Sequence, residues 1–437
     1  MFDFPITEFS GIEQNFGMET MSAIAELRTR NFDKTEAPTT EELVQRAEFF
    51  IPQLRSEQAE SNDRGCYSPD MHEKFQNAGF YKICQPRKYG GYEHSLKTFY
   101  KVMIAVSTGH PAAGWCLTLG ASHAFVLASH WSEKAQDEAF ASGEFIAPHR
   151  ATPTGEIKRV DGGYQVSGRW RYASGVPYST HFIGNALIDD GEGNQKEVAF
   201  IVPRKDYEIL GDWGGGQTVG MCASGSNSVL LEDVFVPDHM FTDWEYYYAR
   251  PDDMKDGTVG AHLHDNPMYL GRLMGPYHIS LVAPVIGAAR AAIEEYESSL
   301  HRQQTLFPPF MARKDQHDFQ RNFGNAIRMT DCAEQLVYAA CDQYDALCER
   351  WKRTSQTISL EENLRIWGVA QQAGKLACDV VELLYQTAGS SASRKGHPLA
   401  QYMGDAQMYR GHVSSQYSAF GGYIAQARLG LPVDIDV

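Results

Sequence analysis

The chain has 437 residues, of which 43% are hydrophobic and 22% charged, and it carries a formal net charge of −16. This length is enough for one large core or for two to three packed subdomains. The acidic balance argues against nucleic acid or an anionic membrane as the main partner. We see no apolar run of the roughly 18 residues that span a bilayer and no secretory signal, so we expect a cytoplasmic protein without a membrane span.

Two residue types with metal or redox chemistry give no site. The eight cysteines are scattered and form no CxxC pair, which is typical of reduced core thiols in a cytosolic protein. His262 and His264 alternate in a loop beside Asp265, but no third ligand follows nearby. We therefore expect no metal centre.

The first part of the chain predicts helices. Residues 1–37 are weakly patterned and predict an arm with one short helix. Thr39 to Glu42 has the pattern of a capping box, and Ser68-Pro69 opens a further helix that stops at Gly79. A turn-rich connector follows, and residues 96–145 resume helical periodicity. These features predict an N-terminal helical domain over 1–145.

The middle of the chain changes to strand patterning. Short β-branched or aromatic segments at 164–172, 181–188, 197–202 and 229–236 are separated by Gly, Pro and Asp. This pattern predicts a small antiparallel β barrel over 146–245. Residues 246–275, rich in Tyr, Asp and Gly, predict an irregular connector.

Long helices dominate the remainder. Apolar stripes at helical spacing run through 279–300, 317–350 and 360–388, and the last of these ends at Gly389. Such helices need partners, so we expect a C-terminal four-helix bundle over 246–437 whose outer stripes support an oligomer. The predicted fold is thus mainly α with a central small β barrel.

This order of elements resembles the acyl-CoA dehydrogenase superfamily, and several local strings resemble it too. They are Ala78-Gly79-Phe80 through Tyr89-Gly90-Gly91, Val166 through Gly175 in the strand region, and Val219 through Ser226 followed by Leu231 through Pro237. The resemblance covers about residues 40–430. Within the superfamily, three details resemble the flavin-dependent monooxygenases, the oxygenase components of two-component aromatic hydroxylases.

The first detail is that the dehydrogenase string Thr-Glu-Pro-Gly-Ala-Gly-Ser-Asp is absent and Ala147 through Thr154 stands in its place. The second is the string Trp170-x-Tyr172-Ala173-Ser174-Gly175, which is similar to the oxygenase form. The third is Asp405-x6-His412, which resembles an oxygenase Arg-Asp-x6-His motif, although Gly404 replaces its arginine and Cys222 replaces another. Apart from the three details, the position of the dehydrogenase catalytic carboxylate holds Arg410. A guanidinium stays protonated and cannot take a proton from a substrate carbon.

The resemblance implies a set of residues at the flavin ring. Ser174 would donate a hydrogen bond at flavin N5, and His412 would tune the oxygen adduct or handle a substrate proton, since the pKa of an imidazole lies near working pH. Trp170 and Tyr172 belong to the same flavin-contacting string. The alternative for His412 is a histidine that satisfies a helix end, and for Ser174 a serine that caps its own turn.

The same resemblance implies residues for the substrate and the flavin phosphates. His123, next to Trp115 on the preceding helix, would hold a phenol oxygen, and His149 would be a further polar substrate contact. The alternative for His123 is a core histidine. A final group would contact the flavin phosphates, in part from a neighbouring subunit: Arg302, Gly389, Ser390 and Ser391.

The implied activity is hydroxylation of an aromatic or heteroaromatic small molecule with O2, by way of a C4a-hydroperoxyflavin. No GxGxxG lies between a strand and a helix, so reduced FMN or FAD would come from a separate flavin reductase. A homotetramer is implied. Two alternatives remain open: an acyl-CoA dehydrogenase-like flavoprotein whose base is Glu232 or Asp405, and a flavin-binding relative without activity.

Overall fold

A computed structural model describes residues 37–189, 191, 193–244, 255–271 and 274–433. The predicted N-terminal arm lies outside these residues except for its last position, as does the connector at 246–254. Residues Thr39–Val437 form one compact unit. The division into three domains stays a prediction, although helices, strands and helices follow one another in the expected order.

The first helices begin at their predicted caps, and the helix after Ser68 also ends where the sequence predicts. The helix after Thr39 was expected to reach Leu54, but it ends at Phe49, and Leu54 lies on the next helix. Thr39 caps its helix through the reciprocal bonds with Glu42, and Ser68 accepts the Met71 amide ahead of Pro69. Gly79 ends that helix in the left-handed conformation that glycine adopts at least cost. The helices of this part are α2 (Thr40–Phe49), α3 (Ile51–Ser56), α4 (Gln58–Arg64), α5 (Pro69–Ala78), α6 (Leu96–Gly109), α7 (Pro111–Ala121), α8 (His123–His130) and α9 (Glu133–Ala139).

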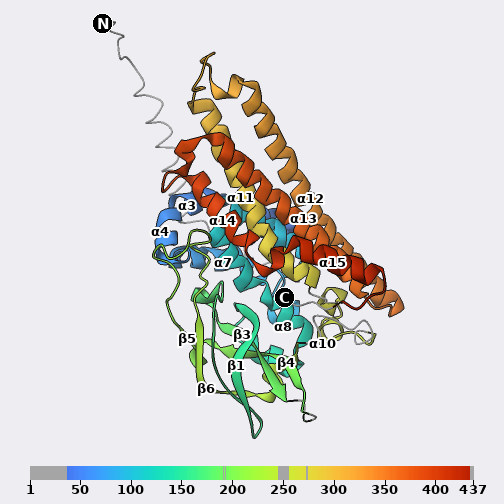
Figure 1. The fold of residues 1–437 in the computed structure, drawn as a ribbon. Helices are drawn as coiled ribbons and strands as arrows, with labels where there is room; N and C mark the ends of the chain where they lie inside the picture. Colours follow the sequence, from blue (N-terminus) through green and yellow to red (C-terminus); the bar gives the residue numbers. More distant parts are fainter. Residues whose placement is uncertain (1–36, 190, 192, 245–254, 272–273, 434–437) are drawn as a thin grey trace. The chain divides into compact units, whose positions relative to one another are not determined.

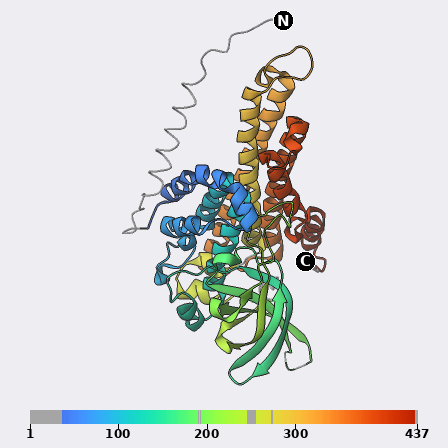
Figure 2. The same cartoon turned by 90° about the vertical axis from the view of Figure 1, so that its left-hand side faces the viewer.

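The stretch Pro111–His130, which covers α7 and α8, is long and apolar enough to cross a membrane. The expectation that no such run exists was therefore wrong. However, 94% of its apolar window is buried inside the fold. In Figures 1 and 2 α7 lies between the bundle helices and the sheet, which is the place of a core helix.

The strands form one seven-stranded sheet in the order β5-β6-β2-β1-β3-β4-β7. Their bounds are β1 (His149–Val160), β2 (Gly163–Trp170), β3 (His181–Asp189), β4 (Gln195–Pro203), β5 (Glu208–Ile209), β6 (Val229–Pro237) and β7 (Phe241–Asp243). The sheet is mixed, because β1 pairs with β3 in parallel. The prediction of an antiparallel unit is corrected at this pair, and the described strands form an open sheet with β5 and β7 at its edges.

The strand β1 was missing from the predicted set. Its sequence is made mostly of small, polar and charged residues, and its burial alternates between exposed and partly exposed with little apolar content. Its backbone pairs with β2 on one side and β3 on the other, so its neighbours define it as a strand. This matters for the site, because β1 begins at His149.

The long helices run as the apolar stripes predict. Their bounds are α10 (Val259–Leu263), α11 (Met274–Arg302), α12 (His317–Thr354), α13 (Leu360–Ala388), α14 (Pro398–Arg410) and α15 (Tyr417–Arg428). Helix α11 packs against α12, α13 and α14, and α15 covers α13. Figure 1 shows α11, α12 and α13 side by side above the sheet. Gly389 ends α13 with a φ of 94° and a ψ of 170°, which is not the left-handed cap that was expected.

Candidate active site

Three segments far apart in the sequence bring Trp115, Ser174 and His412 together. The indole nitrogen of Trp115 on α7 donates to the hydroxyl of Ser174 after β2 at 3.1 Å. The ring of His412, which follows α14, stands edge-on to Trp115 with centroids 6.0 Å apart. The helical part, the sheet and the bundle thus each supply one member, and we call these residues the flavin-edge cluster. Two members that the sequence singled out for the flavin, Ser174 and His412, both contact Trp115.

A glycine permits this approach. Gly175 has a φ of 89°, and a Cβ at this position would lie 2.7 Å from the carbonyl oxygen of Cys116 and from the amide of Gly120. The turn after β2 therefore lies directly on the backbone of α7. This contact places the neighbouring residue, Ser174, against Trp115.

A chain of hydroxyls extends from the cluster into the fold. The Ser174 hydroxyl lies 2.7 Å from that of Ser226, which lies 2.6 Å from that of Ser224. Ser224 and Ser226 are buried, whereas Ser174 is half-buried. The oxygen of Ser174 is held by bonds on the protein side, so its position is set before any ligand arrives.

His412 is a helix cap as well as a member of the cluster. Its Nδ1 accepts the backbone amide of Ser414 at 3.1 Å. In the neutral ring the proton then sits on Nε2, because an accepting nitrogen carries none. Burial, reinforced by the charge of Arg150, lowers the pKa of His412 to about 4. The expectation of a pKa near working pH was therefore wrong.

The arginine at the dehydrogenase base position faces the bundle. Arg410 binds the carboxylates of Glu382 at 2.6 Å and Asp379 at 3.0 Å, both on α13. Glu232, one alternative base, is exposed on β6. Among the described residues, no recorded contact brings a carboxylate to the flavin-edge cluster.

The other alternative base, Asp405, has a structural partner. It is fully buried, and its Oδ1 accepts the Met221 amide at 2.5 Å. Burial raises its pKa to about 7, although the Met221 bond lowers it. A Cβ on Gly404 would lie 2.4 Å from the carbonyl oxygen of Val219, so the backbone leaves no room there for the motif arginine. Asp405 thus ties α14 to the loop that leads to Ser224 and Ser226.

A second cluster forms around His123 and His149, and we call these two residues the histidine pair. Their rings are 5.5 Å apart at 85°. Tyr277 stands near both, at 5.6 Å from His123 and 6.1 Å from His149. Burial lowers the pKa of His123 to about 4 and that of His149 well below its usual value. Both imidazoles are therefore neutral at pH 7.

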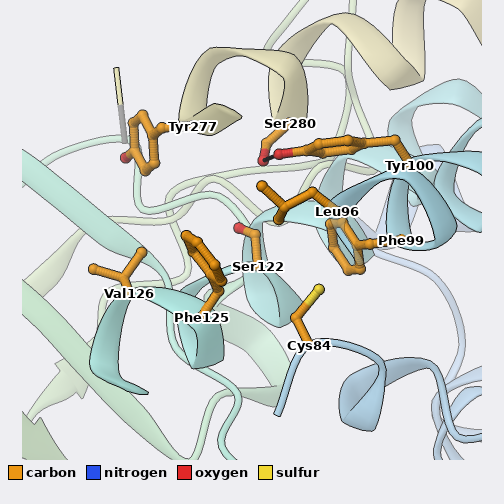
Figure 3. Close-up of a pocket in the computed structure, with 9 residues that line it drawn as sticks. All are labelled: Cys84, Leu96, Phe99, Tyr100, Ser122, Phe125, Val126, Tyr277 and Ser280. Carbon is orange, nitrogen blue, oxygen red and sulfur yellow. Dashed lines mark hydrogen bonds between the residues drawn. The ribbon is translucent and has the colours of Figure 1, made fainter. Parts of the chain in front are cut away.

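A small cavity is lined in part by Tyr277. Figure 3 shows its lining, in which Phe125 and Val126 come from α8 and Ser122 is the residue before it. The Tyr100 and Ser280 hydroxyls bond at 3.1 Å. The cavity is mostly apolar and adjoins the helix that carries His123.

Sequence reasoning overlooked Arg150, which follows His149 on β1. It is half-buried, and its charge lowers the pKa of His412. Burial lowers the pKa of Arg150 itself, whereas Tyr277 and Tyr172 raise it. One of its terminal nitrogens donates to Thr152 at 2.8 Å, and its Nε is buried without a partner. A signal for Arg150 existed, because the cluster has no other cation among the residues that the structure describes. Cys222 stands where the family motif has an arginine, and its thiol donates to the Thr218 carbonyl and supplies no charge.

The two aromatic residues of the Trp170-x-Tyr172 string go to different places. Trp170 is 1% exposed and packs edge-on to Phe182 and Phe200 in the sheet core, where its indole nitrogen donates to the Asn185 carbonyl. Tyr172 is 62% exposed beside Trp213. Tyr172 is therefore available to a cofactor, whereas Trp170 shapes the strand beneath.

The predicted phosphate contacts gather at one end of the bundle, joined by Arg313, another residue that was overlooked. The Arg313 amide donates to Gln303 next to Arg302, and its guanidinium donates to Ala388 next to Gly389. Gly389, Ser390 and Ser391 are exposed. Among the described residues, no recorded contact joins this end to the flavin-edge cluster. Their role stays a prediction.

Known proteins resemble the chain along most of its length. Residues 279–417 match the model of the acyl-CoA dehydrogenase C-terminal domain. The oxygenase subunit HsaA of a flavin-dependent monooxygenase from Rhodococcus jostii (strain RHA1) is 26% identical over 396 residues, which cover 89% of this chain and 99% of that protein. The chain is thus similar to oxygenase components of flavin-dependent monooxygenases and, over its C-terminal helices, to the acyl-CoA dehydrogenases. The predicted resemblance is thereby confirmed.

Two further similar proteins extend this result. The oxygenase component of p-hydroxyphenylacetate 3-hydroxylase from Acinetobacter baumannii is 23% identical, with 90% of each chain covered. The structure of XiaF from Streptomyces in complex with FADH2 and glycerol matches with a TM-score of 0.81 at 23% identity, covering 95% of this chain and 99% of that chain. The latter supports the fold.

The flavin-edge cluster fits the edge of a flavin ring. A half-buried hydroxyl, an imidazole with an Nε2 proton and an indole edge lie together. The buried, unpartnered Nε of Arg150 adds a cation beside them. Such a set can donate hydrogen bonds to a planar cofactor that accepts them along one edge.

Proposed function

We propose that this chain is the oxygenase component of a two-component flavin-dependent monooxygenase, and that it hydroxylates an aromatic or heteroaromatic small molecule. Reduced FMN or FAD would come from a separate flavin reductase. When bound, it supplies the two electrons that let one atom of O2 enter the substrate while the other leaves as water. The observation that carries the proposal is the meeting of Trp115, Ser174 and His412, with Arg410 turned to the bundle.

The roles of the cluster follow from its hydrogen bonds. Trp115 and Ser226 hold the Ser174 hydroxyl in place, so Ser174 can bond the cofactor edge without first being ordered. The Ser414 amide fixes Nδ1 of His412, which leaves Nε2 to donate. As a neutral donor, His412 would stabilise developing negative charge on oxygen.

The substrate would lie on the His123 side. His123 and His149 are neutral and would orient a polar group of the ring, while Trp115 and Tyr277 supply aromatic surface. The buried walls on this side would exclude water from the reacting atoms.

The remaining assignments belong to the same proposal. Arg302 and the exposed run of Gly389, Ser390 and Ser391 would contact the flavin phosphates of a neighbouring subunit in a homotetramer. The enzyme would work in the cytoplasm. The seven-stranded sheet would correspond to the barrel-like middle domain of the family, over residues 146–245.

Rapid mixing tests the proposal. The protein is loaded with reduced flavin, mixed with oxygenated buffer and followed by absorbance. We expect delayed flavin reoxidation with a transient spectrum that belongs to neither reduced nor oxidised flavin. Reoxidation at the rate of free flavin would contradict the proposal and support a relative without activity. A yellow protein that an acyl-CoA thioester reduces would support the dehydrogenase alternative.

A further inference from the structure

The histidine pair contains two buried nitrogens without a hydrogen-bond partner. These are Nε2 of His123 and Nδ1 of His149. His123 is 1% exposed and His149 is 8% exposed, so bulk water has little access to hydrogen-bond with these nitrogens. A buried polar atom without a partner is unfavourable, which makes it a place where a ligand group is expected.

The hydrogen-bond character of His123 follows from its other nitrogen. Nδ1 lies 2.6 Å from the carbonyl oxygen of Ala147. A carbonyl only accepts, so Nδ1 carries the proton. Nε2 of the neutral ring is therefore an acceptor that needs a donor.

The hydrogen-bond character of His149 is fixed through a longer chain. The side-chain nitrogen of Asn185 donates to a carboxylate oxygen of Glu197 at 2.8 Å, which turns its Oδ1 toward His149. That oxygen lies 2.8 Å from Nε2 of His149 and can only accept. Nε2 carries the proton, and Nδ1 is left as the second acceptor.

We propose that the histidine pair selects an aromatic substrate with two adjacent hydrogen-bond donors on its ring, as in a catechol or an aminophenol. Each donor pairs with one of the two lone nitrogens, whose rings lie 5.5 Å apart. The two neutral acceptors offer nothing to an ether oxygen or a carboxylate, which are also acceptors. Two aromatic side chains would form the walls around the substrate ring. Tyr277 lies 5.6 Å from the His123 ring, and Trp244 lies 4.4 Å from the His149 ring.

This inference rests on the proposed function for the identity of the site and deepens it by naming a substrate class. It requires no oxygen chemistry, so binding alone can test it. A site built to bond a hydroxyl discriminates strongly against an analogue that lacks it, because the site's own polar atoms stay unpaired.

The experiment is a binding series by calorimetry, without reductase or reduced flavin. The ligands are catechol, 2-aminophenol, 2-methoxyphenol and 1,2-dimethoxybenzene, which lose donors while the ring stays the same. We expect catechol and 2-aminophenol to bind at least about tenfold more tightly than 2-methoxyphenol, and 1,2-dimethoxybenzene to bind most weakly. Equal binding across the series, or no binding, would overturn the inference.

Variants tie the preference to these nitrogens. His149→Phe keeps the aromatic bulk and removes one acceptor, so the ratio of catechol to 2-methoxyphenol affinity should fall to about one. The control is His181→Phe, a histidine stacked on Phe145 outside the pair, which should keep the wild-type ratio. An unchanged ratio in His149→Phe would overturn the assignment. If that variant does not fold, the wild-type series still decides. A preserved transient in rapid mixing together with equal binding would remove only this inference.

Discussion

The flavin-edge cluster and the histidine pair use the same side chain with opposite hydrogen-bond character. At His412 a backbone amide occupies Nδ1, and the free nitrogen donates. At His123 a backbone carbonyl occupies Nδ1, and the free nitrogen accepts. Burial keeps both rings neutral at pH 7, so the backbone partner decides what each offers. The donor suits oxygen that gains negative charge, and the acceptors suit a substrate that brings hydroxyls.

The largest expected effect comes from removing the donor. His412→Ala should lower the yield of oxygenated product per reduced flavin consumed by about a hundredfold, since loss of one such donor reduces rates by about 10² to 10³. His412→Asn is the matched variant, because an amide can accept from Ser414 and still donate, and it should recover part of the yield. Unchanged yield in His412→Ala would remove His412 from the mechanism.

A substitution at Asp405 tests the link between α14 and the loop that leads to Ser224 and Ser226. The pKa of Asp405, about 7, is above the usual value, so the folded state holds a proton that the unfolded chain has lost. Its contribution to stability is fully present below about pH 4 and is lost as pH rises through 7. Asp405→Asn should remove this dependence and raise the free energy of unfolding at pH 8 by on the order of 2 to 3 kcal/mol.

The measurement for Asp405 is urea unfolding of both proteins between pH 5 and pH 8. The asparagine keeps an oxygen for the Met221 amide, so the loop that carries Ser226 should stay in place. Parallel pH curves for the two proteins would show that Asp405 is not the group that titrates.

Ser174→Ala removes the fixed hydroxyl from the cluster. We expect about a tenfold lower yield of product, with more hydrogen peroxide released, because a single hydrogen bond to a charged group contributes about 1.5 to 3 kcal/mol. Ser224→Ala, at the far end of the hydroxyl chain, should change the yield much less. Equal effects of the two variants would mean that the chain acts as one structural unit.

The smallest effect is expected at Arg410. Arg410→Met removes ion pairs with Asp379 and Glu382 that are partly exposed, so it should lower the free energy of unfolding by about 1 kcal/mol or less. Product yield should stay at the wild-type level. A loss of product yield without a loss of stability would show that Arg410 takes part in the reaction. The position of the dehydrogenase base would then be used in this protein as well.

The sequence predicted the long elements well, because caps and apolar stripes are local signals. Thr39, Ser68 and the α13 stripe fall in this group. It missed β1, whose strand character comes from its neighbours. It also missed Arg150, because the effect of Arg150 on His412 depends on segments that are distant in the sequence. The pKa of His412 was predicted wrongly, because burial by segments distant in sequence cannot be read from its own motif.

The most direct test is a neutron crystal structure of the deuterium-exchanged protein at pH 7. The account predicts deuterium on Nε2 of His412, on Nδ1 of His123 and on Nε2 of His149, with the remaining nitrogen of each ring bare. Deuterium on Nε2 of His123 or on Nδ1 of His412 would contradict it.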